Sequence, residues 1–255
     1  MNVGAHWFDL EAARAMELEA VRRWFAPRSR VLEIGAGSGF QARMISSWGC
    51  AVVALDVAFP RIGTCSGGVL YDGVKLPVRA HSVDLVFTSN ALGHVEVSRL
   101  RPLFDEIRRA LKPGGRVVCI VPTAIWRLWA TLSHYPFALQ YLLGRRTVLG
   151  GTSPELRSVL RRRGLMATVM RTVVPGPHGA YPNALSELFA FRRARWHRMF
   201  VALGFRIVAE RYSGLFYTGS SLMPWLGLSA RRKLARVLGS ACSVFVLEPE
   251  VKGAR

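Results

Sequence analysis

The sequence predicts an α/β fold in which helices cover both faces of a doubly wound, mostly parallel sheet of seven strands, with a helical insertion after the fifth strand. Two observations carry this prediction. Over the first 121 residues, short apolar runs rich in β-branched residues alternate with helical stretches, as a parallel sheet buried on both faces requires. The alternation breaks after Pro122, and two more strand-like runs return nearer the carboxyl terminus.

The individual elements follow from spacing and from helix-ending residues. A leading amphipathic helix is predicted from Leu10 to Phe25, where apolar residues recur at helical spacing until Pro27 ends the pattern. A later helix, 99–111, ends at the Lys-Pro-Gly-Gly sequence of residues 112–115, because proline cannot continue a helix and glycines allow the chain to reverse. Further helices are predicted at 184–203 and 229–238. The predicted strands are 30–34, 51–57, 68–71, 83–88, 116–121, 206–212 and 243–248.

The segment after Pro122 is long and aromatic for a connection, and connections of this length are usually functional. We predict a single domain over 1–255, made of a first half (1–121), an insertion (122–200) and the last strands (201–255). Arg127, His134 and Pro136 interrupt the apolar start of the insertion, which favours an interfacial or substrate-covering helix over a membrane span. The aromatic residues of this start are Trp126, Trp129, Tyr135, Phe137 and Tyr141.

Positive charge is concentrated in the second half of the chain. Of the net charge of +19, residues 1–121 carry +4 (15 basic, 11 acidic) and residues 122–255 carry +15 (20 basic, 5 acidic). Such asymmetry is typical of proteins that contact nucleic acid, a phosphorylated metabolite or an anionic membrane surface. Only four of the 35 basic residues are lysines, so a coding bias toward G and C explains the charge equally well, and both interpretations stay open.

The amino terminus and the cysteines bear on the compartment. Charges run throughout the first 25 residues, without the apolar run and small-residue site of a signal peptide, so we predict a cytoplasmic location. The four cysteines (Cys50, Cys65, Cys119, Cys242) form no CxxC pair. The sequence therefore predicts neither a disulfide framework nor a metal site.

The strongest motif is the sequence VLEIGAGSG at residues 31–39, an apolar strand that runs into a glycine-rich turn before a helix. Gly35, Gly37 and Gly39 allow the backbone to approach a ligand closely, and the following helix offers free N–H donors at its start. The spacing is GxGxG followed by Phe40, which differs from the GxGxxG of dinucleotide-binding turns.

Acidic and polar residues stand at the ends of the next three strands. Asp56 ends the second, where a carboxylate can accept two ribose hydroxyls, although a lone aspartate there is more often a turn or cap residue. Asp72 follows the third strand. The fourth, VDLVFTSN, ends on Ser89 and Asn90, with His94 shortly after. The conjunction of these residues is more specific than any one of them.

Taken together, the motifs resemble the class I S-adenosylmethionine-dependent methyltransferases, particularly those acting on small molecules and lipids. The resemblance covers about residues 30–121 and rests on VLEIGAGSG, VVALD, DGVKLP, VDLVFTSNALGHV and LKPGGRVV. It implies a Rossmann-like fold, methyl transfer as the reaction and S-adenosylmethionine as the cofactor.

The resemblance also implies roles for single residues. Glu33 and the backbone of Gly35, Gly37 and Gly39 would hold the amino-acid portion of the cofactor. Asp56 would bind the ribose, Asp72 the adenine amino group and Val57 an adenine face. Ser89 and Asn90 would lie beneath the sulfonium. Asp84 would start the fourth strand and take no part in the site.

Two departures from the family pattern matter. Gly93 and His94 replace a bulkier pair, and Ser-Asn-Ala-Leu follows the fourth strand instead of the Asn/Asp-Pro-Pro-Tyr type of nucleic-acid amino methyltransferases. The second departure argues against a nucleic-acid base as acceptor.

Two histidines are the candidate catalytic residues, because a hydroxyl acceptor must lose a proton during transfer. His94 follows the fourth strand, where packing or helix capping is the alternative role. His178 lies in a Pro-Gly-Pro-His-Gly turn, with Tyr181, Asn183 and Glu187 close enough in sequence to share its surface. A plain loop histidine is the alternative there.

The main hypothesis is a methyltransferase acting on a small or lipid-like acceptor at oxygen, with peripheral contact to an anionic membrane as a further partner. The first half would bind the cofactor and residues 122–200 would choose the acceptor. Three alternatives stay open: an RNA methyltransferase, a non-catalytic binding or scaffold protein of the same fold, and a nicotinamide-dependent oxidoreductase.

Overall fold

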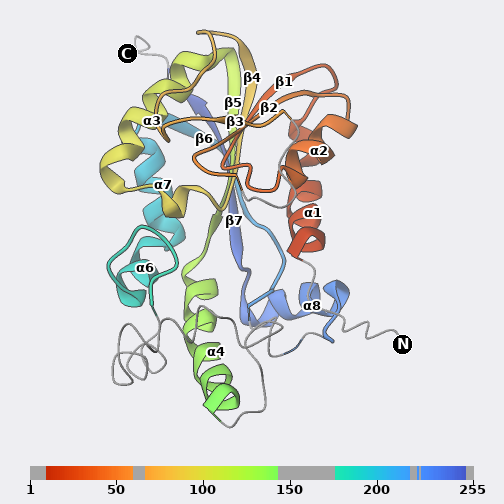
Figure 1. The fold of residues 1–255 in the computed structure, drawn as a ribbon, viewed down its shortest axis with the longest axis vertical. Coiled ribbons are helices and arrows are strands. Elements are labelled where there is room, and N and C mark those ends of the chain that lie inside the picture. The colour runs from red at the N-terminus through yellow and green to blue at the C-terminus, as the bar shows by residue number, and fades with distance from the viewer. Residues whose placement is uncertain (1–9, 60–66, 143–175, 219–222, 224, 251–255) are drawn as a thin grey trace.

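A computed structural model describes residues 10–59, 67–142, 176–218, 223 and 225–250. Its centre is a seven-stranded sheet in the order β3-β2-β1-β4-β5-β7-β6 (Figure 1). The strands are β1 (Arg30–Ile34), β2 (Ala51–Asp56), β3 (Val69–Leu70), β4 (Val83–Ser89), β5 (Leu111–Pro122), β6 (Phe205–Tyr212) and β7 (Cys242–Pro249). The first five pair in parallel, and β7 lies antiparallel to both β5 and β6. The predicted doubly wound, mostly parallel, Rossmann-like sheet is therefore confirmed.

Helices cover both faces of this sheet, and others lie beyond its end. The described α-helices are α1 (Leu10–Val21), α2 (Phe40–Ser47), α3 (Val97–Ala110), α4 (Ala124–Leu142), α6 (Ala184–Ala190), α7 (Arg193–Ala202) and α8 (Leu228–Leu238). In Figure 1, α1 and α2 lie on one side of the sheet and α3 and α7 on the other. This arrangement explains why the strands read as continuous apolar runs.

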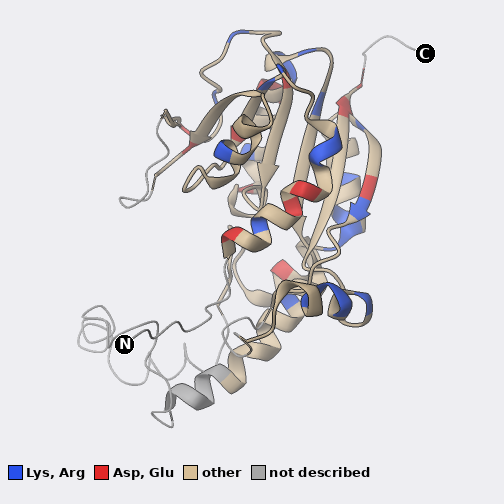
Figure 2. Cartoon of the chain, turned by 90° about the vertical axis from the view of Figure 1, so that its right-hand side faces the viewer, with Lys and Arg blue, Asp and Glu red and all other residues tan. Residues whose placement is uncertain are grey.

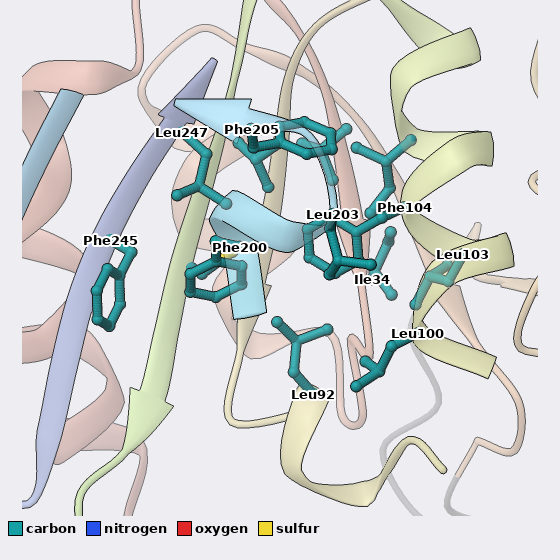
Figure 3. Close-up of a cluster of buried hydrophobic side chains, with 14 of the residues drawn as sticks. Ile34, Leu92, Leu100, Leu103, Phe104, Phe200, Leu203, Phe205, Phe245 and Leu247 are labelled. Atoms are coloured by element: carbon teal, nitrogen blue, oxygen red, sulfur yellow. The ribbon is translucent and has the colours of Figure 1, made fainter. Parts of the chain in front are cut away.

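Strand β5, in the interior of the sheet, contributes side chains to the hydrophobic cores on both faces. Val117 and Cys119 pack on the α3 and α7 side, whereas Val118 and Ile120 pack on the α1 side, since successive side chains of a strand point to opposite faces. The first core joins Phe104 of α3 to Phe200 and Phe205 from α7 and β6 (Figure 3). Both faces are buried, which holds the carboxyl ends of the strands in fixed positions.

The connection from β3 to β4 differs from the predicted alternation, because residues 71–82 form turns and no helix. Gly73 takes a left-handed φ of 84°, and Pro77 follows closely, so this short segment cannot continue a helix. Leu76 nevertheless reaches the core, with 2% of its surface exposed. In this connection the Leu76 side chain, and not a helix, packs against the core of the sheet.

Two predicted boundaries are also wrong. The helix predicted over 184–203 is two helices, α6 and α7, which break at Phe191 and Arg192. The fifth strand begins at Leu111, earlier than predicted, and takes in the proline-glycine segment with a register shift opposite Val83 and Leu85. A bulge of this kind accommodates Pro113, which has no N–H for the ladder.

The insertion leaves the sheet directly from the end of β5. Thr123 separates β5 from α4, and its hydroxyl donates to the Ser240 carbonyl at 2.6 Å, so the start of α4 is tied to the segment before β7. Among the described residues, no helix combines the length and the apolar character that crossing a bilayer demands.

Candidate active site

The glycine turn after β1 has a left-handed backbone that suits its three glycines. Gly35, Gly37 and Gly39 adopt φ values of 78°, 54° and 70°, a region that glycine enters without steric cost. A Cβ on Gly35 would lie 2.3 Å from the Ala91 Cβ, so this glycine allows the turn to touch the loop after β4. A Cβ on Gly37 would meet nothing within 4 Å. The turn thus presents open backbone at the start of α2.

Asp56, the last residue of β2, ties down this turn. Its Oδ2 accepts a hydrogen bond from the Gly37 N–H at 2.7 Å, and its Oδ1 accepts one from the Ala58 N–H at 3.1 Å. The carboxylate therefore sits between the glycine turn and the carboxyl end of β2, at the edge where ligands of open α/β sheets bind.

Glu33 is a buried acid beside this turn, with 1% of its surface exposed. Burial, reinforced by the nearby charge of Asp56, raises the pKa of Glu33 to about 8. Its Oε2 has no hydrogen-bond partner among the described residues. Because a buried polar atom without a partner is costly, the position suits a ligand that brings a cationic donor.

Asp72 and Val57 lie side by side at the ends of β3 and β2. The Asp72 Oδ1 accepts from the Val74 and Lys75 N–H groups at 2.8 and 2.7 Å, and these donors lower the pKa of the exposed carboxyl. Val57 is 61% exposed, and a Cβ on Gly73 would lie 3.1 Å from its Cγ1. An exposed apolar side chain next to a carboxylate suits a flat, polar-edged ring.

The end of β4 opens into a cavity of about 620 Å³. Asn90 has a left-handed φ of 56°, donates to the Ser89 Oγ at 3.3 Å and accepts from the Cys242 Sγ at 3.3 Å. Strained non-glycine residues of this kind cluster at functional sites. The other lining residues are Leu10, Arg14, Gly93, His94, Pro122, Trp126, Ala130, Ser133, His178, Gly179, Phe191, Tyr217 and Thr218.

Both candidate histidines line this cavity. The ring centroids of His94 and His178 are 5.1 Å apart, and Trp126 stands edge-on to His178 at 4.9 Å. Burial, and then the neighbouring His94, lower the pKa of His178. His178 is therefore neutral at neutral pH and able to accept a proton.

A buried ion pair that the sequence does not reveal holds the His178 loop. Glu187 of α6 accepts hydrogen bonds from the backbone N–H groups of His178, at 2.7 Å, and of Gly179. Its carboxylate pairs with Arg127 of α4 at 3.1 Å, and Arg127 also donates to the Gly176 carbonyl at 2.6 Å. Both side chains are almost fully buried. The sequence contains two separate signals, the charge of Arg127 within an apolar stretch and the closeness of Glu187 to His178, but nothing that pairs the two side chains.

Comparisons with known proteins agree with this geometry. Residues 32–119 match the family model described as a methyltransferase domain. Through this segment, about a third of its length, the chain is similar to the class I S-adenosylmethionine-dependent methyltransferases. The matched segment runs from β1 to β5 and so includes the glycine turn, Asp56, Asp72 and the end of β4.

Two curated relatives share this segment. A bifunctional biotin-biosynthesis protein of Cellvibrio japonicus is 34% identical over 35% of this chain and 19% of its own length. A sterol 24-C-methyltransferase of Schizosaccharomyces pombe is 31% identical over 42% of this chain and 32% of its own. The chain thus spans at most about a third of either relative.

The fold extends beyond that segment. A solved S-adenosylmethionine-dependent methyltransferase of Mesorhizobium loti is similar over 91% of this chain and 97% of its own, with a TM-score of 0.52 and 21% identity. The family fold is thereby shown for nearly the whole chain.

The predicted site residues fall into two adjoining groups. Ser89, Asn90, His94 and His178 share the cavity. The others lie beside it at the ends of β1 to β3, joined through the contact of Gly35 with Ala91. This second group comprises Glu33, Gly35, Gly37, Gly39, Asp56, Val57 and Asp72.

Both candidate histidines line the cavity, but only some of the aromatic residues of the insertion do. Trp126 lines the cavity, whereas the Trp129 indole turns away and donates to the Leu238 carbonyl at 3.0 Å. Tyr135 is half exposed, and the side chains of Phe137 and Tyr141 lie outside the described residues.

Proposed function

We propose that this chain binds S-adenosylmethionine at the glycine turn and transfers its methyl group to a small or lipid-like acceptor, at oxygen, in the cavity. The observation that carries this proposal is the grouping of Ser89 and Asn90 with His94 and His178 around one cavity beside the turn. On one side of the cavity, Ser89 and Asn90 end a strand that would bind the cofactor. On the other side, the histidines would supply a base.

The residues present fit the cofactor. Glu33 offers a buried carboxylate oxygen without a partner to an amino group, and Gly37 leaves open space above its backbone. Asp56 would take the ribose, while Asp72 and Val57 would receive the adenine. Ser89 and Asn90 would lie beneath the sulfonium. When bound, the cofactor supplies an electrophilic methyl group.

The chain's own part in the reaction is mainly positioning. An in-line displacement needs the acceptor oxygen held in one orientation, and the aromatic walls of Trp126 and Phe191 can hold an apolar acceptor and exclude water. His178, kept neutral by burial, would accept the hydroxyl proton at one ring nitrogen, with His94 beside it. Glu187 and Arg127 would keep His178 in place.

This proposal assigns functions to the three parts of the single domain 1–255. Residues 1–121 would bind the cofactor, 122–200 would choose the acceptor and 201–255 would complete the sheet. The sterol relative is by its name a C-methyltransferase of a sterol, so it supports a lipid-like acceptor here and gives no support for oxygen as the methylated atom. The cytoplasmic location stays a prediction.

The test is calorimetry with S-adenosylmethionine, followed by mass analysis of products formed with labelled cofactor and host extract. We expect micromolar cofactor binding and one methylated small molecule or lipid. Absence of binding would favour a scaffold protein, and preference for NADH would favour an oxidoreductase. A methylated RNA with steeply salt-dependent affinity would favour the RNA alternative.

Cofactor binding should also release a proton from Glu33. The raised pKa of about 8 keeps Glu33 mostly protonated at neutral pH, and a cationic amino group beside it favours the ionised form. Calorimetry in buffers of different ionisation enthalpy measures the release. Glu33→Gln should abolish this contribution, and equal proton release by the variant would contradict the assignment of Glu33.

The same pKa shift makes the cofactor-free protein less stable in alkali. Because the pKa of Glu33 is higher in the folded than in the unfolded protein, Glu33 contributes stability that is fully present below about pH 4. That contribution to the free energy of unfolding is lost as the pH rises through about 8. Urea unfolding from mildly acidic to alkaline pH should therefore show a steeper decline for the wild type than for Glu33→Gln. Parallel declines would show that Glu33 is already ionised when folded.

A further inference from the structure

Helix α4 exposes a stripe of large apolar side chains. Ile125, Leu128, Leu132 and Tyr135 are 39%, 40%, 47% and 49% exposed. Their spacing of three, four and three residues places them within an arc of about 80° on one side of the helix, at 100° per residue. A solvated helix normally presents polar residues on such a face.

The opposite side of α4 already has a role. Trp126, Ala130 and Ser133 line the acceptor cavity, and Arg127 faces α6 through its ion pair with Glu187. Neither the cavity nor the core therefore requires the apolar stripe.

A basic helix borders the stripe. The exposed Arg232, Lys233 and Arg236 lie on α8, and Arg232, Arg236 and Ile125 line one cavity of about 520 Å³. The Trp129 indole donates to the Leu238 carbonyl, and a Cβ on Gly239 would lie 2.6 Å from Ile125. These contacts fix the stripe and the basic helix side by side.

The charge on this face has one sign. Neither α4 nor α8 contains an acidic residue, and the outer part of α4 carries no charged residue at all (Figure 2). We call the four stripe residues together with Arg232, Lys233 and Arg236 the α4–α8 surface.

We propose that the α4–α8 surface docks on an anionic lipid bilayer. Apolar side chains at the boundary between headgroups and acyl chains, flanked by arginines and lysines toward lipid phosphates, are what an interfacial helix requires. RNA would neutralise the same arginines but leave the stripe in water, so the bilayer satisfies both halves of the surface. If the proposed function is correct, docking also brings the α4 wall of the cavity to the membrane, where a lipid-like acceptor resides.

Vesicle co-sedimentation of the full chain, without cofactor, tests the docking. We expect binding to vesicles of equal parts phosphatidylglycerol and phosphatidylcholine, and none to phosphatidylcholine alone. The Arg232→Gln, Arg236→Gln double variant should bind roughly thirtyfold more weakly, because each basic residue near an anionic surface contributes about 1 kcal/mol. Leu128→Ser with Leu132→Ser should lose binding roughly tenfold or more.

The matched control removes two exposed arginines elsewhere, by Arg79→Gln with Arg198→Gln, and should bind as the wild type does. Melting temperatures check that each variant is folded. An equal loss in test and control variants would reduce the effect to diffuse charge and overturn the proposal. The proposal would also be overturned if the wild type failed to bind anionic vesicles, or if it bound RNA but no vesicles. Because no turnover is measured, these outcomes are independent of the proposed reaction.

Discussion

Replacing Asp56 by alanine should weaken S-adenosylmethionine binding by about 1.5 to 3 kcal/mol, or roughly ten- to 150-fold in Kd, because a charged acceptor loses its hydrogen bonds. The structure adds a second reason for the loss. Asp56 also accepts from the Gly37 N–H at 2.7 Å, so alanine frees the glycine turn as well as removing the ribose partner.

Asp56→Asn separates these two effects, because its amide oxygen can still accept from Gly37 but carries no charge. Asp105→Ala removes a carboxylate from the exposed face of α3 and should leave cofactor binding unchanged. Calorimetry on all three variants, with a melting curve for each, provides the comparison. An unchanged Kd in folded Asp56→Ala would remove Asp56 from the site.

The sequence predicts the first half of this fold well because local patterns decide it. Each strand there is an apolar run, and the glycine turn and Asp56 stand at strand ends that a parallel sheet brings to one edge. Boundaries fail where local signals conflict with packing. The Pro113 segment predicts a turn between a helix and a strand, but it is part of β5. The connection from β3 to β4 contains no helix, and its Leu76 side chain is buried instead.

The acceptor side is harder to predict because long-range contacts build it. His178 could be selected from its unusual turn, but nothing in the sequence pairs Arg127 with Glu187 or brings His94 to His178. Trp126 and Trp129 look equivalent in sequence, yet helical geometry sends one to the cavity and the other to α8. Such choices depend on which side of α4 each neighbour occupies.

Replacing His178 by alanine should lower kcat by ~100- to 10,000-fold, the range that a positioned general base contributes, while the Kd for S-adenosylmethionine stays unchanged. The separation is expected because His178 lines the cavity, whereas Asp56 and the glycine turn that it holds are not among the lining residues. His197→Ala, which removes a half-exposed histidine from α7, is the matched control and should retain full turnover.

The pH profile distinguishes a base from a histidine that only shapes the cavity. Burial and His94 lower the pKa of His178, so its neutral form persists to a lower pH than that of an ordinary histidine. Turnover should rise with pH and reach half its maximum below the usual histidine range. His94→Ala removes the charge that opposes protonation of His178, so the midpoint should move to higher pH. If His178 only shaped the cavity, His178→Ala would lower turnover, but the wild type would show no rise of turnover with pH and His94→Ala would not shift the midpoint of such a rise.

The variant His178→Ala also tests the site assignment. Loss of cofactor affinity equal to the loss of turnover would place His178 outside the acceptor machinery, and unchanged turnover would exclude it as the base.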